Sequence, residues 1–312
     1  MKTLRIFFVD FWNDFSIEDN FILNLLKEKY QIIIDSSKPD FLFYSSFGVT
    51  HFKYKSAIKI YFTGENDVPD FNLCDYGIGS AHISFENRYF RLPLYRLYKG
   101  YEDLFQKKNF SKQVLERKFC NFVYSNAQVS DPIRRSFFER LSQYKQVDSG
   151  GRYLNNIGYC VDDKIQFIAD YKFTIAFENS RLSGYTTEKL LDPMRVNSLP
   201  IYWGNPRVRE DFNIDSFIYV DSDADFDKII AEIIRLDTDD SAYLEKLNHS
   251  WVNESSSLQW KADFQNFLFE IVEQSPSSAM RTSPYGFQSR YQKKQQLSAR
   301  LLNNIFFRRM IK

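Results

Sequence analysis

The sequence predicts an α/β protein made of two halves, and three features support this prediction. The chain has 312 residues, which exceeds the roughly 250 to 300 at which a single hydrophobic core usually stops growing. Short β-rich runs alternate with helical patterns over residues 4–80, and the alternation resumes after residue 150. This spacing is typical of parallel βαβ units. Gly150 and Gly151, between the two series, mark a place where the chain can turn from one domain to the next.

The first half is expected to contain one clearly marked helix among its strands. Ser16, followed three residues later by Asp19, resembles a capping box, and apolar residues then recur, which predicts a helix over residues 16–30. Apolar runs rich in β-branched and aromatic residues predict the strands. These runs cover residues 4–9, 31–35, 40–46, 57–66 and 75–80.

The second half shows the same alternation of helices and strands. Helices are expected at 162–171, 187–196 and 225–236, and strands at 172–178, 199–204 and 217–222. Pro193 lies too deep in its helix to be a first-turn proline. It should therefore kink that helix or remove one of its hydrogen bonds.

The composition is that of a soluble globular protein. Hydrophobic residues make up 44% of the chain and charged residues 26%, and the formal net charge is +1. The basic surplus of a nucleic-acid-binding protein is missing, so we expect no nucleic-acid partner. Cys74, Cys120 and Cys160 are too widely spaced for a disulfide framework or a CxxC metal site, and we expect buried free thiols.

No targeting or membrane-spanning segment is expected. Asp10 interrupts the first apolar patch well short of the roughly 7 to 15 residues of a signal peptide. No apolar run approaches the roughly 20 residues of a transmembrane helix. We therefore expect a cytoplasmic protein, or one held peripherally on the inner face of the cytoplasmic membrane.

Residues 176–206 gather polar side chains around the start of one helix. The strand ends on Glu178 and Asn179, and Glu188 and Lys189 fall in the first turn of the next helix. In open α/β sheets, ligands bind outside the carboxyl ends of the strands, and the unpaired N–H groups of a helix N-terminus suit a phosphate. The alternative is that the acid only stabilises the helix dipole, which is worth about 0.3 to 1 kcal/mol.

The same stretch resembles the signature of a known enzyme family. FENSRLSGYTTEKLLDPMRVNSLPIYWGNP, residues 177–206, closely resembles the signature of the α1,3/α1,4-fucosyltransferases. Further segments look like family segments, in the family's order: YFTGENDVPDFNLCDYGIG (61–79), FVYSNAQVSDPIRRSFFERL (122–141), VDSGGRYLNNIG (147–158) and YWGNPRVREDFNIDSFI (202–218). Together they cover about residues 60–260, whereas both ends of the chain match only loosely.

The resemblance, which is to the bacterial type, implies a fold and a donor. Enzymes of this family invert the anomeric centre, use GDP-fucose and have two Rossmann-like domains that face a cleft, the GT-B architecture. We therefore expect an acceptor-binding α/β domain over residues 1–149 and a GDP-fucose-binding α/β domain over 150–275. A basic amphipathic tail is expected over 276–312.

Glu65, in the segment TGEN, falls where the family's proposed general base sits. An inverting transfer needs one carboxylate to take the proton of the acceptor hydroxyl while that oxygen attacks the anomeric carbon opposite the leaving diphosphate. The resemblance implies that Glu65 has this role. From the residues alone, the alternative is an acid that caps a turn beside Asn66 and Asp67.

The leaving GDP carries negative charge, so cations aimed at its phosphates can replace an acid catalyst. Lys189 and Arg134 match the family's phosphate-binding positions, and we expect both to bind the donor. Arg135 is the neighbouring alternative, and both arginines could also belong to a solvated helix face. Arg134 is preferred because the run PIR keeps the family's order.

The resemblance places further residues at the donor. Glu188 would lie near the fucose and stabilise an oxocarbenium-like transition state, while Asn179 and Tyr185 would contact the diphosphate or the ribose. Glu178 would only order the loop. The expected catalytic pair is Glu65 and Glu188, and the expected donor-binding set is Arg134, Asn179, Tyr185, Glu188, Lys189, Ser125 and Asn126.

An acidic run near residue 221 mimics a metal site. Asp221, Asp223, Asp225 and Glu232 stand at positions 1, 3, 5 and 12 of a calcium loop, but Phe226 replaces the required glycine. The same aspartates resemble the DxD metal motif of a different glycosyltransferase fold. We expect an acidic entrance to the following helix instead. No metal or cofactor is expected to be required, although a divalent cation could assist the departure of GDP.

The C-terminal tail is basic and amphipathic. Residues 286–312 contain no acid, and their basic residues are Arg290, Lys293, Lys294, Arg300, Arg308, Arg309 and Lys312. Apolar residues recur at helical spacing, namely Leu297, Leu301, Leu302, Ile305 and Phe306. Such helices lie on anionic lipid surfaces, so residues 287–312 are expected to contact a membrane peripherally. The alternative is a helix packed back on the protein, and the two can be combined.

The sequence therefore predicts an inverting fucosyltransferase. It would move fucose from GDP-fucose to a hydroxyl, with O3 the expected position, of N-acetylglucosamine in an oligosaccharide or glycolipid such as N-acetyllactosamine. The alternatives are an enzyme that uses another GDP-sugar and a non-catalytic glycan- or nucleotide-binding module on the same fold. The presence of Glu65, Arg134, Glu188 and Lys189 together speaks against such a module.

Overall fold

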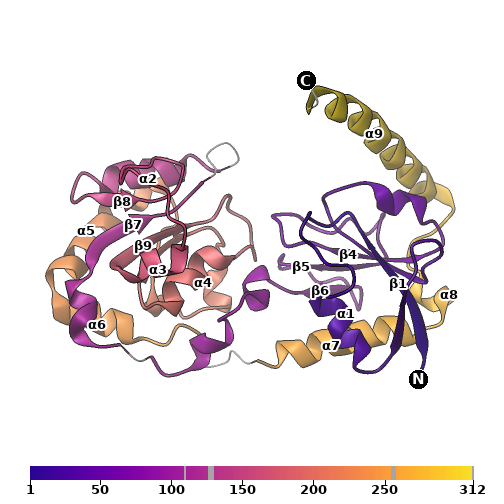
Figure 1. Ribbon diagram of the computed structural model, residues 1–312, viewed down its shortest axis with the longest axis horizontal. Coiled ribbons are helices and arrows are strands. Elements are labelled where there is room, and N and C mark those ends of the chain that lie inside the picture. The colour runs from indigo at the N-terminus through magenta and orange to yellow at the C-terminus, as the bar shows by residue number, and fades with distance from the viewer. Residues whose placement is uncertain (109, 126–129, 254–257, 311–312) are drawn as a thin grey trace. The chain divides into compact units, whose positions relative to one another are not determined.

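The computed structural model describes residues 1–108, 110–125, 130–253 and 258–310, with side chains as far as Leu301 in the last helix. It consists of two compact α/β units (Figure 1). The first unit combines Met1–Leu92 with Gln259–Lys312, and the second is the continuous segment Pro93–Leu258. Some residues of interest lie outside the description, namely Asn126 and the side chains of Leu302, Ile305, Phe306, Arg308, Arg309 and Lys312.

The first unit is built on a parallel sheet with the order β2-β1-β3-β4-β5-β6. Its strands are β1 (Thr3–Val9), β2 (Gln31–Ile34), β3 (Phe41–Tyr44), β4 (Ile58–Phe62), β5 (Tyr76–Gly79) and β6 (Tyr89–Arg91). β3 and β4 are buried along their whole length, as expected of strands covered on both faces. The chain moves outward from β1 in both directions, so the switch point of this doubly wound sheet lies between the carboxyl ends of β1 and β3.

The helices of the first unit are α1 (Phe21–Lys27), α7 (Trp260–Glu273), α8 (Pro276–Ala279) and α9 (Gly286–Met310). The helix expected over residues 16–30 is shorter because Asn20 caps it, with its Oδ1 accepting the Leu23 N–H at 2.9 Å. The Ser16 hydroxyl accepts the Asp19 N–H, but in the turn that precedes the helix. The expected capping box was therefore wrong.

α7 brings the end of the chain to the core that the first residues begin. Phe264 packs against Phe21 of α1 with ring centroids 6.0 Å apart, and the Lys2 ammonium donates to the Val272 carbonyl. Figure 1 shows α1 and α7 side by side on one face of the sheet. Each Phe, Leu, Ile or Val side chain that α7 buries contributes about 1.5 to 3 kcal/mol. The first unit is thus discontinuous in sequence.

The second unit holds a parallel sheet with the order β11-β10-β9-β7-β8. Its strands are β7 (Lys118–Phe122), β8 (Val147–Ser149), β9 (Tyr171–Phe177), β10 (Leu199–Trp203) and β11 (Ile218–Tyr219). The central strand β9 is buried along its whole length, which agrees with the apolar run at 172–178. In chain order this sheet is also doubly wound, with its switch point between the carboxyl ends of β7 and β9.

The second unit's helices cover this sheet. They are α2 (Ile133–Leu141), α3 (Lys164–Ala169), α4 (Glu188–Arg195), α5 (Phe226–Thr238) and α6 (Asp240–Asn248). Pro193 lies inside α4, which ends two residues later at Arg195. Short 3₁₀ turns occur at Thr50–Lys53, Leu94–Leu97, Glu102–Phe105, Lys112–Glu116, Val208–Glu210, Ile214–Ser216 and Asp223–Asp225.

This division of the chain differs from the expected boundary between residues 149 and 150. β7 and β8 precede that boundary, yet β7 pairs with β9 on one side and with β8 on the other. The glycine pair at 150–151 therefore turns the chain within the second unit. A Cβ at Gly151 would lie 1.9 Å from the carbonyl oxygen of Tyr124, so this glycine allows a close approach of two backbone segments.

Smaller expectations had mixed outcomes. Cys74 and Cys120 are buried free thiols as expected, whereas Cys160 is exposed in the loop before α3. The 3₁₀ turn Asp223–Asp225 leads into α5 and forms the expected acidic entrance. Within the described ranges, no three His, Cys, Asp or Glu side chains are grouped to hold a metal ion. Across the same residues, no helix combines the length and apolar character that a membrane span needs.

The first turns of α9 are attached to the first unit. The Tyr291 hydroxyl donates to Asp70 Oδ2 at 2.8 Å, and Gln292 Nε2 donates to the Asn72 carbonyl at 2.8 Å. Leu297, farther along the helix, is 60% exposed. The expected packing on the protein is therefore present in the first turns of this helix, and an exposed apolar side chain follows.

Candidate active site

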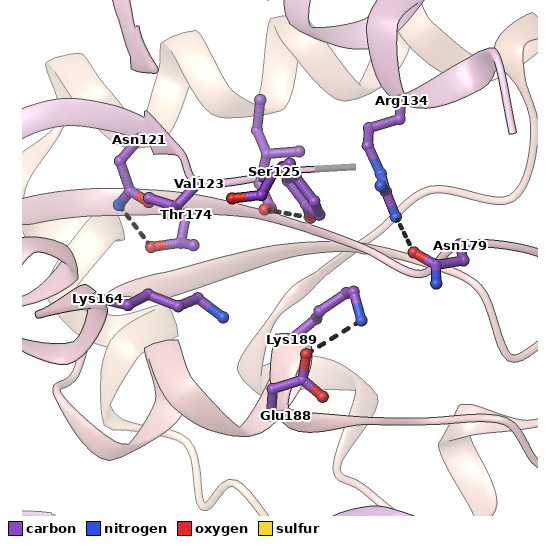
Figure 2. Close-up of a pocket in the computed structure, with 11 residues that line it drawn as sticks. Asn121, Val123, Ser125, Arg134, Lys164, Thr174, Asn179, Glu188 and Lys189 are labelled. Carbon is purple, nitrogen blue, oxygen red and sulfur yellow. Dashed lines mark hydrogen bonds and ion pairs between the residues drawn. The ribbon is translucent and has the colours of Figure 1, made fainter. Parts of the chain in front are cut away.

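A cavity of about 210 Å³ lies at the switch point of the second unit's sheet. β7 and β9 contribute residues on and after their carboxyl ends, and α2, α3 and α4 contribute the rest (Figure 2). Parallel strands end at the same edge of a sheet, which is why polar residues far apart in sequence meet here. The lining residues are Asn121, Val123, Tyr124, Ser125, Arg134, Lys164, Thr174, Ile175, Asn179, Glu188 and Lys189.

A buried carboxylate sets where α4 begins. Glu178 is fully buried, and its Oε1 accepts the Thr187 N–H at 2.8 Å. The Thr187 hydroxyl lies 2.8 Å from Glu178 Oε2 and caps the helix by accepting the Lys189 N–H. Glu178 thus orders the loop, as expected. Because two N–H groups at the start of α4 are already bonded, the positive charge offered to a ligand comes mainly from side chains.

Lys189 lies between two carboxylates. Its ammonium is 3.5 Å from Glu178 Oε2 and 3.1 Å from Glu188 Oε1. Burial lowers the pKa of Lys189, but the charges of the two glutamates outweigh this, so the pKa is raised well above its usual value. Lys189 is therefore a permanent cation on the cavity wall.

Glu188 is held in its ionised form. Burial raises the pKa of Glu188, but the charges of Lys189 and Lys164 and a hydrogen bond from Lys189 lower it by more. Tyr98 lies nearby, and the pKa of its hydroxyl is raised by burial and by the charge of Glu188. The cavity thus presents one ionised carboxylate among cations.

Arg134 reaches the cavity from α2. It is 1% exposed, and its Nη2 donates to the Phe177 carbonyl at 2.9 Å and to Asn179 Oδ1 at 3.0 Å. Its guanidinium lies 4.0 Å from the centre of the Tyr124 ring. Arg135 is exposed and forms an ion pair within α2. Of the two neighbouring arginines, Arg134 is the one that faces the cavity, and its contact with a donor stays a prediction.

Two buried polar atoms on lining residues have no hydrogen-bond partner in the part of the chain that the structure describes. They are Arg134 Nε and Asn121 Oδ1. The other end of the Asn121 amide is bonded, since its Nδ2 donates to Thr174 Oγ1 at 2.8 Å. An unpaired buried polar group costs about 1 to 3 kcal/mol. A ligand with both donor and acceptor groups would supply the missing partners.

The structure brings together in this cavity most of the expected donor-binding residues, namely Ser125, Arg134, Asn179, Glu188 and Lys189. Tyr185 does not line it and is 4% exposed. The loop that contains Tyr185 is bonded to the segment after β10, because the Gly184 N–H donates to Asn205 Oδ1 at 2.8 Å. In the sheet, β10 and β7 lie on opposite sides of β9. The charge of the Tyr185 phenol nevertheless helps to raise the pKa of Lys189, so this ring lies near the cavity wall, and its contact with a nucleotide stays a prediction. Asn126 lies outside the described residues.

Sequence reasoning missed Lys164 and Asn121. Lys164 opens α3, and its ammonium donates to Asp192 Oδ2 at 2.8 Å. Figure 2 shows Lys164 and Lys189 entering the cavity from separate helices. Nothing in the sequence distinguishes Lys164 from a solvated lysine. Asn121 could have been noticed in the sequence, because it is an uncharged polar residue inside the otherwise apolar run FCNF.

Glu65, the expected base, belongs to the first unit and lies just beyond the carboxyl end of β4. Its side chain is exposed, and its N–H donates to the Thr63 hydroxyl at 3.1 Å. The loops after two other strands of this sheet, β1 and β3, carry exposed aromatic residues. Trp12 follows β1 and Phe47 follows β3, with exposures of 38% and 52% and ring centroids 6.4 Å apart. An acid and two aromatic rings therefore share the edge where the first sheet has its switch point.

Comparisons with known proteins agree with this arrangement. The family descriptions "Alpha-(1,3)-fucosyltransferase FucT N-terminal domain" and "Glycosyltransferase family 10 (fucosyltransferase) C-term" match residues 6–98 and 114–275. The chain is 34% identical over 311 residues to the alpha-(1,3)-fucosyltransferase FucT of Helicobacter pylori, with 86% of this chain and 64% of that protein covered. It is 28% identical over 190 residues to the human GDP-fucose protein O-fucosyltransferase 3, with 57% of this chain and 36% of that protein covered. The chain thus spans less than two thirds of the length of each.

Two crystal structures of an alpha1,3-fucosyltransferase have a similar fold. The one with GDP-fucose gives a TM-score of 0.70 at 30% identity, with 86% of this chain and 91% of that chain covered. The one with GDP gives a TM-score of 0.75 at 29% identity, with 88% and 91% covered. The expected pair of α/β units with parallel sheets is confirmed. The second family description alone matches more than half of the residues of this chain. The chain therefore belongs to glycosyltransferase family 10, the fucosyltransferases.

Proposed function

We propose that this protein transfers fucose from GDP-fucose to the O3 hydroxyl of N-acetylglucosamine in an oligosaccharide or glycolipid, with inversion at the anomeric carbon. The observation that carries the proposal is the cavity at the second switch point. There Arg134, Lys164 and Lys189 converge from three helices. Membership of the fucosyltransferase family supports fucose as the transferred sugar.

The donor's diphosphate is the group that these cations suit. Departure of GDP leaves negative charge on the phosphate oxygens, and fixed cations in a partly water-excluded site stabilise that charge without a proton donor. The guanidinium of Arg134 is already oriented by Asn179 and by the Phe177 carbonyl, so it needs little reorganisation. A cavity of about 210 Å³ is smaller than the range of roughly 300 to 1,000 Å³ for drug-sized ligands. We infer that it holds the diphosphate and its neighbours rather than the whole donor.

Glu188 fits a role beside the sugar. Its lowered pKa keeps it ionised, and it faces the cavity beside Lys189. When the bond to GDP breaks, positive charge develops on the sugar ring while negative charge develops on the phosphate. A carboxylate and a cation side by side can stabilise these two charges in one transition state.

The first unit supplies the features that an acceptor site needs. Glu65 lies at the carboxyl edge of the sheet, where ligands of doubly wound sheets bind. The rings of Trp12 and Phe47, exposed at the switch point, offer flat apolar surfaces for the faces of sugar rings. We infer that the acceptor glycan lies along this edge with its hydroxyl toward Glu65.

Trp12→Ala is expected to raise the KM for N-acetyllactosamine about three- to tenfold, because one aromatic contact is worth about 0.5 to 1.5 kcal/mol. The KM for GDP-fucose should stay unchanged, since the donor cavity belongs to the other unit. Initial rates with each substrate varied in turn give both constants. Tyr285→Ala, which removes an aromatic side chain that is 80% exposed elsewhere in the same unit, is the matched control. An unchanged acceptor KM in Trp12→Ala would remove this ring from the acceptor site.

The reaction itself is tested by incubating the protein with GDP-fucose and N-acetyllactosamine. Free GDP should appear together with a product one fucose heavier, and the linkage and anomeric configuration of that product report O3 transfer and inversion. Parallel reactions with another GDP-sugar, with a chelator and with Mg²⁺ test the donor and any assistance by a divalent cation. GDP-fucose binding without turnover would favour the non-catalytic module instead.

A hydroxyl of a protein is the second candidate acceptor. The observation that favours it is the similarity to a relative described as a GDP-fucose protein O-fucosyltransferase. Mass spectrometry of a polypeptide substrate incubated with GDP-fucose distinguishes the two acceptors.

A peripheral position on the inner face of the cytoplasmic membrane is proposed from α9. Leu297 and Leu301 are 60% and 56% exposed, and Lys293, Lys294 and Arg300 lie around them. Apolar and cationic groups on one exposed helix suit an anionic lipid surface. Leu297→Gln/Leu301→Gln should lower the membrane-bound fraction without affecting the attached first turns, and equal fractionation of variant and wild type would end the idea.

A further inference from the structure

The first unit contains a second cavity, of about 250 Å³, at the amino edge of its sheet. It is lined by the start of β4 and the loop before it, by the segment between α8 and α9, and by the first turns of α9. Glu65, Trp12 and Phe47 lie at the opposite, carboxyl edge of the same sheet. The cavity is therefore separate from the surface assigned to the acceptor.

Three lysines and no acid line this cavity, in the part of the chain that the structure describes. They are Lys55, Lys59 and Lys293, and across the same residues their ammonium groups make no hydrogen bond or ion pair. Lys55 and Lys293 are exposed, as solvated lysines are. Lys59 differs from them, because it is only 9% exposed.

A buried ammonium without a partner is costly, because burial removes its hydration. Burial lowers the pKa of Lys59 even though the charge of Asp75 opposes this. Asp75 is an acid near Lys59, but its carboxylate oxygens already accept hydrogen bonds from other groups. It accepts the N–H groups of Lys59, Arg281 and Thr282 at 2.7–2.8 Å, and also the Thr282 hydroxyl at 3.0 Å.

The remaining groups of the cavity complete an anion site. Ser289, in the first turn of α9, brings a hydroxyl, and the Gln292 amide, which donates one N–H to the Asn72 carbonyl, has a second N–H for a ligand. Three ammonium groups around a cavity of this size exceed what a single monovalent anion needs. They suit a phosphate monoester, which carries about −1.5 to −2 charge at pH 7 and for which a lysine acts as a point charge.

We propose that this cavity binds a phosphate group through Lys59, with Lys55 and Lys293 at its mouth. The phosphate can come from a free phosphate compound or from the headgroup of an anionic lipid. The site does not depend on the donor chemistry of the second unit, because every residue that forms it belongs to the first.

The test is a calorimetric titration with inorganic phosphate at fixed ionic strength. Lys59→Met should weaken phosphate binding at least about tenfold, since a hydrogen bond to a charged group is lost. Lys38→Met, which removes an exposed lysine elsewhere in the same unit, should titrate like the wild type. Any phosphate that binds at another site should bind equally to Lys59→Met and Lys38→Met, so the comparison of these two variants reports only the proposed site. Equal titration of Lys59→Met and Lys38→Met would overturn the proposal.

A second variant guards against a change in folding. Lys55→Met/Lys293→Met alters only exposed positions and should also weaken phosphate binding. In thermal unfolding, phosphate should raise the Tm of the wild type more than that of Lys59→Met, because a ligand stabilises only a protein that binds it. A phosphate-induced rise of the same size in all variants would count against the site.

Vesicles separate the two sources of phosphate. Phosphatidylcholine vesicles that contain phosphatidic acid carry the monoester on a lipid, whereas those that contain phosphatidylglycerol carry a diester. If the headgroup is the ligand, wild type and Lys38→Met should float more with the phosphatidic acid vesicles than with the phosphatidylglycerol vesicles, whereas Lys59→Met, which keeps the exposed leucines of α9, should float equally with both. If no variant distinguishes the two kinds of vesicle but the titrations with inorganic phosphate differ, the ligand is a free phosphate compound.

Discussion

Glu65→Gln is expected to lower kcat by about 10²-fold or more, because a positioned general base contributes about 10²- to 10⁴-fold. Glutamine keeps the size of the side chain but cannot accept a proton. Binding of GDP should be unchanged, since Glu65 and the donor cavity lie in different units. Steady-state rates with GDP-fucose and N-acetyllactosamine measure kcat, and calorimetry measures the affinity for GDP.

Asp67→Asn is the matched control for this prediction. Asp67 is an exposed acid of the same loop, and both of its carboxylate oxygens already accept hydrogen bonds, from the Tyr61 hydroxyl and the Val68 N–H. It should retain most of the activity. Equal losses in both variants would assign the effect to the loop, and near-normal turnover of Glu65→Gln would remove this residue from the mechanism.

Lys189→Ala is expected to weaken both donor binding and turnover. Its ammonium faces the cavity and also neutralises Glu178 and Glu188. Removing one group that stabilises developing negative charge costs about 10²- to 10³-fold in kcat. The affinity for GDP should also fall, because two carboxylates would then repel the diphosphate. GDP calorimetry and steady-state kinetics measure the two losses.

Loss of stability has to be separated from loss of binding in this variant. Glu178 is fully buried, and removing the partner of a buried charge costs about 3 to 5 kcal/mol of unfolding free energy. Glu178→Gln/Lys189→Ala removes both charges, so thermal stability should recover while GDP binding stays weak. Recovery of GDP binding together with stability would show that Lys189 acts through the fold and not on the phosphate.

Much of the fold could be predicted because its buried strands are continuous apolar runs. β4 and β9 are buried along their whole length, and such runs leave little choice of structure. β6 and β8 span only Tyr89–Arg91 and Val147–Ser149, so no periodic pattern marks them. The boundary between the units was misplaced for a different reason. A turn at a glycine pair is a local feature, whereas membership of a unit depends on strand pairing between distant residues.

The candidate site could be predicted only where residues belong to a recognisable motif. Arg134, Glu188 and Lys189 lie in segments that resemble a family, and the structure brings them to one cavity. Tyr185 lies in the same motif but is buried beside the cavity rather than lining it, and the hydrogen bond of its loop to Asn205 cannot be deduced from spacing. Lys164 had no motif to mark it.

The discontinuity of the first unit has a consequence for synthesis. Its sheet is complete by Arg91, but α7, which covers that sheet, begins at Trp260. At about 5 to 20 residues per second, translation of the intervening segment, residues 93–258, takes roughly 8 to 33 s. During that interval the face of the nascent sheet that α1 and α7 share is covered by α1 alone, while the second unit is still being made. A ribosome-bound chain that ends before α7 should therefore be the form that chaperones bind most and proteases cut first.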